Sequence, residues 1–227
     1  MPEFDEFAQD YESILNSDLD FSGENMEYFA NYKAECVHDF LGSDFKGRIL
    51  DYGCGIGMVA KCLKENFDRE GVSIFGFDVS DESVKAAREK VQGVQFSSDL
   101  EKLGQEPFDA IIVANVLHHV KPEERDDFFK QVRSYLSKNG LIFVFEHNPY
   151  NPLTRHVVKN SVFDKDASLL NAGEALRLMR ENGMNVVERK YIVFFPGFLK
   201  KLRFLESKLG FIPMGAQYMC VGGKNEA

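Results

Sequence analysis

Short apolar runs alternate with amphipathic stretches of helical length from about residue 48 onward, and no other feature constrains the fold as strongly. Such runs are typical of strands buried on both faces of a parallel sheet, with helices as the connections between them. The runs lie at 48–51, 73–77, 94–96, 108–114 and 141–145. The pattern predicts an α/β fold in which five strands alternate with helices.

The chain after the fifth run predicts two further strands and one helix. Asn139-Gly140 is expected to make the turn into the fifth strand, and two Asn-Pro pairs at 148–149 and 151–152 mark a loop after it. A helix is expected at about 173–182, followed by a strand near 186–194 and a last strand at 217–221.

Composition favours one soluble domain without nucleic-acid contacts. With 227 residues, 44% of them hydrophobic, the chain can bury one large core, so we expect a single domain over residues 1–227. Its formal net charge of -9 would repel a phosphate backbone, so DNA and RNA are not expected as substrates.

The cysteines and the N-terminal residues indicate the cellular compartment in which the protein is expected. The four cysteines form no C-x-x-C pair, which predicts neither a zinc knuckle nor a disulfide framework. The first residues are acidic, and nowhere do about 18 apolar residues follow one another as a membrane span requires. We therefore expect a cytoplasmic protein.

Glycines occupy every second position directly after the first apolar run, at Gly53, Gly55 and Gly57, and a helical stretch follows them. Glycine has no Cβ, so a ligand can approach the backbone closely, and the start of the helix offers free N–H groups. Asp78 ends the next run, where a carboxylate can accept hydrogen bonds from ribose hydroxyls. A dinucleotide fingerprint would need glycine where Met58 stands, so NAD is disfavoured.

Residues 51–57 match in full the motif Asp/Glu-x-Gly-x-Gly-x-Gly, and at this point the chain resembles the class I (Rossmann-like) S-adenosylmethionine-dependent methyltransferases. The resemblance covers about residues 47–146. It implies a three-layer α/β/α sandwich with a mostly parallel seven-stranded sheet whose last strand is antiparallel, and S-adenosylmethionine as the cofactor. The cofactor contacts that it implies are Asp51, Tyr52, Gly53, Cys54, Gly55, Gly57, Asp78, Val79, Ser98, Asp99, Leu100, Asn115 and Val116. For Asp51, bracing of the glycine loop is an equal alternative.

The methyl acceptor is expected beyond the fourth and fifth strands, because ligands of open α/β sheets bind at the carboxyl ends of the strands. His147 is the preferred general base, ahead of Glu146 and His118, and a packing role is the alternative for each. His119 is expected to pack or to brace the loop. The order of these residues shows no recognised metal-ligand spacing, so no metal site is predicted.

The flanks of the cofactor-binding core, which we place at 46–147, are expected to enclose the acceptor. Residues 1–45 would form a helical cap with Tyr11 among its aromatics, and residues 148–227 an acceptor-side lid with the last two strands. Phe198, Leu202, Leu205 and Leu209 would share one helical face, which we expect to pack on the protein's own core. Contact of that face with a membrane surface is the less favoured alternative.

Residues 146–155 together with 163–167 resemble a segment of certain bacterial methyltransferases that modify glycans or other small molecules. This second resemblance implies a small-molecule or sugar acceptor and methylation of oxygen or nitrogen. Two other functions stay open: a cofactor-binding regulatory protein without catalysis, and a nicotinamide-dependent oxidoreductase.

Overall fold

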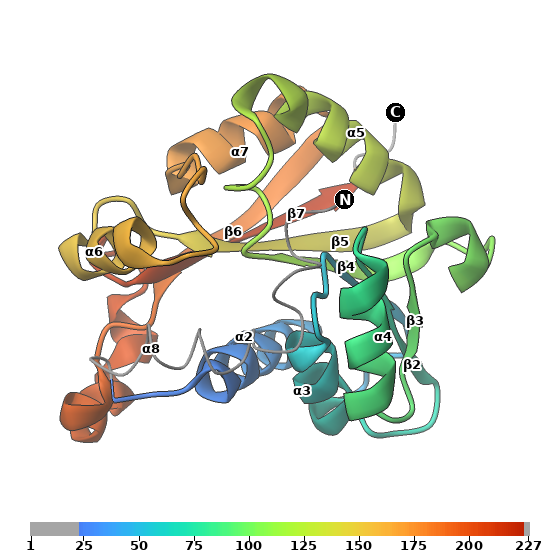
Figure 1. Ribbon diagram of the computed structural model, residues 1–227, viewed down its shortest axis with the longest axis horizontal. Coiled ribbons are helices and arrows are strands. Elements are labelled where there is room, and N and C mark those ends of the chain that lie inside the picture. The colour runs from blue at the N-terminus through green and yellow to red at the C-terminus, as the bar shows by residue number, and fades with distance from the viewer. Residues whose placement is uncertain (1–22, 225–227) are drawn as a thin grey trace.

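One seven-stranded sheet runs through the molecule, with its strands in the order β3-β2-β1-β4-β5-β7-β6 (Figure 1). The computed structural model describes residues 23–224, so residues 1–22 of the expected cap, Tyr11 included, lie outside the described part. The strands are β1 (Gly47–Tyr52), β2 (Val72–Phe77), β3 (Gln95–Ser97), β4 (Phe108–Ala114), β5 (Leu136–His147), β6 (Met184–Ile192) and β7 (Gln217–Lys224). β7 is antiparallel to both its neighbours and the remaining pairs are parallel, which confirms the predicted sheet.

Helices cover both faces of the sheet and complete three layers (Figure 1). One face carries α2 (Met26–Leu41), α3 (Met58–Asn66) and α4 (Asp81–Lys90), and the other carries η2 (Leu100–Leu103), α5 (Arg125–Tyr135) and α7 (Ala172–Glu181). An apolar cluster lies on each face. Neighbouring strand residues point to opposite faces, so Ile49 packs in the cluster with α2, α3 and α4, and Leu50 packs in the cluster with η2, α5 and α7. The remaining elements are η3 (Pro122–Glu124), α6 (Pro152–Asn160), η4 (Gly197–Leu205) and α8 (Glu206–Leu209).

The fifth strand differs from its expected form. β5 begins at Leu136, and Asn139-Gly140 lies inside it instead of preceding it. Leu136 pairs with Phe108 of β4, and Leu141 then pairs with Ala110, so the residues between them form an irregularity in the pairing. The predicted turn is thus a bulge within the strand, and regular pairing resumes where we expected the strand to begin.

The apolar stripe at 198–209 does not pack on the core, and that expectation was wrong. The segment is 3-10 helical with a kink at Leu199 and ends in one short α-helical turn. Of the stripe, Phe198 and Leu202 are 77% and 39% exposed, and Leu205 and Leu209 are half-buried outside the two apolar clusters. A buried polar contact anchors the segment instead: the Glu206 carboxylate accepts hydrogen bonds from the Phe194 and Phe195 N–H groups and from the Tyr32 hydroxyl. None of the described helices is long and apolar enough to cross a membrane.

Arg125 holds the segment before α7 against the turn after β4. Its side chain is 2% exposed and donates to the Val120 carbonyl, the Ser168 carbonyl and the Glu174 carboxylate. The Ser168 N–H in turn donates to the carbonyl of His118 at 2.7 Å. These bonds fix the preceding loop, residues 161–168, beyond the carboxyl ends of β4 and β5.

Arg125→Met is expected to lower the free energy of unfolding by about 3 kcal/mol, because it leaves two carbonyls and a carboxylate without their donor. Urea denaturation measures the change. The matched control is Arg177→Met, which removes an exposed ion pair to Glu181 and should change stability by less than about 0.5 kcal/mol. Equal effects of the two substitutions would contradict the role of Arg125.

Candidate active site

The three glycines of the loop after β1 meet different surroundings. All three have positive φ, and a Cβ on Gly53 would lie 2.4 Å from Val116 Cγ2, while one on Gly57 would lie 3.0 Å from Phe96. A Cβ on Gly55 would have nothing within 4 Å. Packing therefore requires glycine at 53 and 57, whereas Gly55 faces open space in which a ligand can lie against the backbone.

Asp78 lies directly beside this loop. Its Oδ2 accepts a hydrogen bond from the Gly55 N–H at 2.8 Å, and its Oδ1 accepts one from the Ser80 N–H at 2.9 Å. The N–H groups of Gly53 and Cys54 both donate to the carbonyl of Phe77, which ties the loop to the end of β2. The carboxylate predicted to bind ribose is thus held in place by the loop itself.

The other residues predicted near the cofactor divide into supporting and accessible ones. Tyr52, Cys54 and Leu100 are buried at 7%, 7% and 8% exposure, so their side chains belong to the apolar clusters on the two faces of the sheet. Val79 is 67% exposed beside Asp78. Ser98 donates to the Asp81 carboxylate, and Asp99 accepts from the Glu101 N–H at the start of η2.

Three buried oxygen atoms at this edge of the sheet lack a hydrogen-bond donor. One is Gln217 Oε1 at the start of β7, opposite His147. The two on β1 and just after β4 are Asp51 Oδ2, on a side chain that is 1% exposed, and Asn115 Oδ1. Burial raises the pKa of Asp51 to about 7, and Asn115 has a positive φ of 57° at the end of β4. Unpaired buried acceptors are unfavourable, so both fit a ligand that brings hydroxyl or ammonium donors.

Lys33 of α2 was not predicted from the sequence. It is 3% exposed, and burial lowers its pKa to about 8 although the negative charges of Glu146 and Asp51 act in the opposite direction. The available signal was its helical spacing, because Lys33 shares the buried face of α2 with Ala30, Ala34 and Val37. A lysine on such an apolar face places a cation inside the site.

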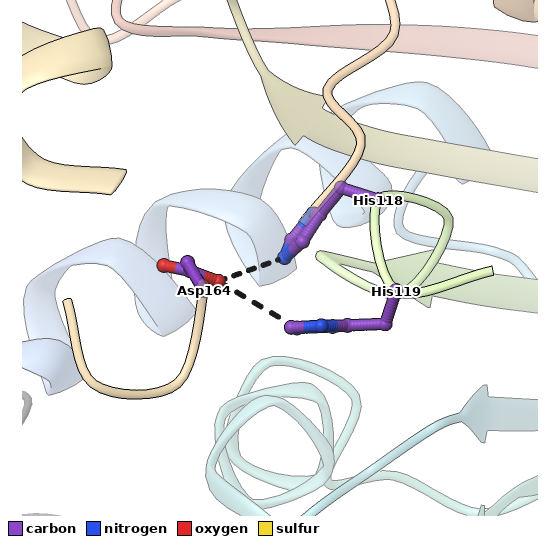
Figure 2. Close-up of side chains that lie close together, drawn as sticks. All are labelled: His118, His119 and Asp164. Atoms are coloured by element: carbon purple, nitrogen blue, oxygen red, sulfur yellow. Dashed lines mark ion pairs between the residues drawn. The ribbon is translucent and has the colours of Figure 1, made fainter. Parts of the chain in front are cut away.

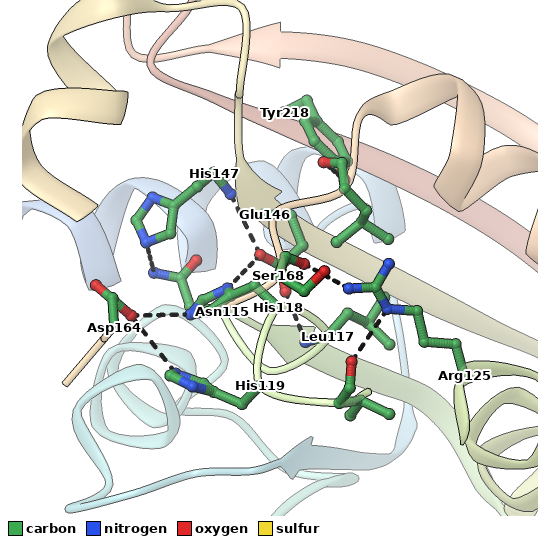
Figure 3. A network of polar contacts seen from close by, with 12 residues as sticks. Asn115, Leu117, His118, His119, Arg125, Glu146, His147, Asp164, Ser168 and Tyr218 are labelled. Carbon is green, nitrogen blue, oxygen red and sulfur yellow. Dashed lines mark hydrogen bonds and ion pairs between the residues drawn. The ribbon is translucent and has the colours of Figure 1, made fainter. Parts of the chain in front are cut away.

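A network of polar side chains joins the ends of β4 and β5 (Figure 3). Glu146 is fully buried: its Oε1 accepts from the Leu117 N–H at 2.7 Å, and its Oε2 lies 2.6 Å from His118 Nδ1. On the other side of the ring, His118 Nε2 lies 3.2 Å from Asp164 Oδ1. The same Asp164 oxygen lies 3.6 Å from His119 Nε2 (Figure 2).

The charges in this network are set by burial and by the carboxylates. Burial alone would lower the pKa of His118, but Glu146 and Asp164 outweigh it and raise this pKa to about 10. Burial and then the His118 cation lower the pKa of both His119 and His147 to about 4. Burial would raise the pKa of Glu146 and Asp164, yet the histidines hold both values below normal.

The three residues predicted for catalysis, His147, Glu146 and His118, thus lie together. The His147 ring lies 5.1 Å from that of His118, and its Nε2 lies 3.5 Å from the Asn115 side-chain nitrogen. Asp164 was missed as a site residue. It lies in a loop far along the chain from His118, and its only signal was the segment 163–167 of the second resemblance.

The fold and the glycine loop define an α/β protein with a nucleotide-type cofactor site at the carboxyl edge of its sheet. Residues 24–189 match the family model described as a methyltransferase domain, and the chain belongs to this family of S-adenosylmethionine-dependent methyltransferases. The oxidoreductase alternative is thereby set aside. A solved S-adenosylmethionine-dependent methyltransferase from Thermotoga maritima shares the fold, with 20% identity, a TM-score of 0.67 and 98% of each chain covered.

Two curated relatives are similar over part of the chain. An uncharacterized methyltransferase of Staphylococcus carnosus (strain TM300) is 32% identical over 147 residues, which cover 63% of this chain and 65% of that protein. The cyclopropane-fatty-acyl-phospholipid synthase of Escherichia coli (strain K12) is 29% identical over 124 residues, which cover 53% of this chain and 31% of that protein. The chain therefore spans less than two thirds of the length of either relative.

Gly55→Ala is expected to weaken binding of S-adenosylhomocysteine, the demethylated cofactor, at least about tenfold, because its methyl group would fill the open space beside the loop. The folded protein should lose no more than about 1 kcal/mol of stability. Calorimetric titration and thermal unfolding measure the two effects. Gly53→Ala is the comparison: its methyl group clashes with Val116, so it should destabilise the fold itself. Normal binding by Gly55→Ala would contradict the assignment.

The protonation states of the three histidines in the network are expected to stay constant between roughly pH 5.5 and pH 8, where an ordinary histidine titrates. The raised pKa keeps His118 protonated through this range, and the lowered pKa keeps His119 and His147 neutral. The protein is first treated with a chelator so that no metal ion is bound to the histidines. The pH dependence of the ring signals in NMR spectra, assigned with single His→Gln variants, then tests this. A midpoint near pH 6.5 at His119 or His147 would contradict it.

Proposed function

We propose that the protein transfers the methyl group of S-adenosylmethionine to a hydroxyl or amine of a polar small molecule, with a sugar hydroxyl as the first choice. The observation that carries this proposal is that the polar network begins in the turn after β4, where Val116 lies against Gly53 of the glycine loop and the next residues, Leu117 and His118, contact Glu146. Histidine, carboxylate and amide groups at the carboxyl edge of the sheet suit an acceptor rich in hydrogen-bonding groups. The second resemblance, through residues 146–155 and 163–167, points to the same class of acceptor.

The cofactor is proposed to lie between the glycine loop, Asp78 and the end of β4. Asp78 would accept hydrogen bonds from the ribose, and the exposed Val79 side chain would cover one face of the adenine. The unpaired oxygens of Asp51 and Asn115 would accept from donors of the methionine part, and Lys33 would face its carboxylate. When bound, the cofactor supplies a methyl group that needs only an aligned nucleophile.

The three predicted catalytic residues are proposed to have different roles. His147 stays neutral near pH 7 and keeps an imidazole nitrogen able to take a proton from the acceptor. Both carboxylate oxygens of Glu146 already accept hydrogen bonds, and both ring nitrogens of His118 face carboxylates. Glu146 and His118 are therefore proposed as positioning residues.

We propose that α6 and the loop 161–168 enclose the acceptor from one side and that α2 encloses it from the opposite side. Asn151 caps α6 through the N–H groups of Leu153 and Thr154 and donates from its side-chain nitrogen to the Met214 carbonyl. Tyr150 is 60% exposed just before this helix. A ring with a polar tip suits a surface that closes over a hydroxylated ligand.

The assay of this function measures S-adenosylhomocysteine formed with a panel of free sugars, nucleotide sugars and small amines. Mass spectrometry of the acceptor should show the addition of one methyl group to at least one hydroxylated compound. Cofactor binding without transfer to any member of the panel would favour the regulatory alternative, a binding protein without catalysis.

Lys33→Met is expected to weaken binding of S-adenosylhomocysteine by about tenfold or more, because a charge-assisted hydrogen bond to the ligand carboxylate is lost. Removal of a buried charge should leave the stability of the protein equal or higher. The matched control is Lys85→Met on the exposed face of α4, which should alter neither quantity. An unchanged dissociation constant for Lys33→Met would remove this residue from the cofactor site.

A further inference from the structure

We propose that His118, His119 and Asp164 form a binding site for one divalent transition-metal ion, such as zinc or cobalt, which holds an oxygen atom of the acceptor. The donor atoms are His118 Nε2, His119 Nε2 and Asp164 Oδ1, and all lie within 4.8 Å of one another (Figure 2). Two histidines and one carboxylate are a ligand set for zinc and for several other first-row metals.

The separations between the donor atoms suit a metal ion. Bonds of about 2.0–2.1 Å in tetrahedral geometry place neighbouring ligand atoms about 3.3 Å apart. Asp164 Oδ1 lies 3.2 Å from His118 Nε2 and 3.6 Å from His119 Nε2. The remaining pair, the ring nitrogens of His118 and His119, lies within 4.8 Å.

A second carboxylate orients the most deeply buried ligand. Glu146 accepts from His118 Nδ1 at 2.6 Å, which directs Nε2 toward Asp164. Histidine ligands of metal ions commonly donate their other ring nitrogen to a carboxylate in this way. The backbone of His118 is fixed as well, because its carbonyl accepts from the Ser168 N–H of the Asp164 loop. The arrangement therefore includes the outer support that a metal site requires.

The site is accessible from one side. The side chain of His118 is 1% exposed and that of Asp164 is 11% exposed, whereas that of His119 is 28% exposed. Three protein ligands leave a fourth position of a tetrahedral ion for another molecule, as in catalytic zinc sites. An acceptor oxygen would reach that position from the side of His119, the most exposed of the three ligands.

The charge of the network also suits a cation. The carboxylates of Glu146 and Asp164 lie against the two ring nitrogens of His118, at 2.6 Å and 3.2 Å. A divalent ion bound at Nε2 would lie close to both carboxylates. A hydroxyl bound to such an ion gives up its proton more readily, which suits the weak base that burial makes of His147.

Metal binding can be tested apart from catalysis, although the role of the metal rests on the proposed function. The 227-residue chain is treated with a chelator, dialysed and titrated with Co²⁺, whose visible spectrum reports nitrogen and oxygen ligands. Zn²⁺ is then titrated by calorimetry. We expect one ion per chain with a dissociation constant below roughly 10 µM, and weaker binding at lower pH because protons compete for the ligands.

The variants decide which residues bind the metal. Asp164→Asn and His119→Gln should each weaken Co²⁺ binding at least about tenfold. Asp166→Asn and His156→Gln, which alter exposed residues of the 161–168 loop and of α6, should leave Co²⁺ binding unchanged. Circular dichroism and binding of S-adenosylhomocysteine verify that each variant is folded.

Three outcomes would overturn the metal site: no Co²⁺ binding at millimolar concentration, unchanged binding in both ligand variants, or loss of binding in His156→Gln. The network would then have a structural role, in which protonated His118 forms ion pairs with the carboxylates of Glu146 and Asp164. S-adenosylhomocysteine binding in the same samples separates the two proposals. Cofactor binding without metal binding overturns only the metal site, whereas metal binding without cofactor binding overturns only the proposed function.

Discussion

The buried carboxylate of Glu146 is the group on which the polar network beyond β4 and β5, the proposed acceptor side, depends. A buried charge is unfavourable unless hydrogen bonds and an opposite charge compensate it, and Glu146 receives both from the turn after β4. The Leu117 N–H and the His118 ring fix that turn, and His118 then faces Asp164. One carboxylate at the end of β5 thus determines how a neighbouring strand and a distant loop meet.

The two halves of the site draw on different physical properties. The glycine loop is shaped by packing, because Gly53 and Gly57 contact Val116 and Phe96 and leave Gly55 facing open space. The acceptor side is shaped by charge, with one cation held between two carboxylates and two neutral imidazoles beside it. Lys33, on a third element, places a second cation where both halves meet.

The sequence was sufficient for the parts of this structure that depend on local order along the chain. Apolar runs and the spacing of the glycines predicted six of the strands to within a few residues, because each strand and its following turn are contiguous. The bulge at Asn139-Gly140 was missed because it depends on the partner strand. The positions of Asp164 and of the segment 198–209 were missed for a related reason. They are fixed by long-range contacts of Arg125 and Glu206, and no periodic pattern in the sequence indicates such contacts.

The reversed last strand has a consequence for the order in which the chain can fold. β7 lies between β5 and β6, so β6 has no strand to pair with until residues 217–224 are present. During synthesis, strands β1 to β5 can assemble as the chain leaves the ribosome. The backbone groups of residues 184–192 stay unpaired until β7 has been made. The edge of the sheet next to the acceptor side therefore closes last, and loss of the final strand would release β6 with it.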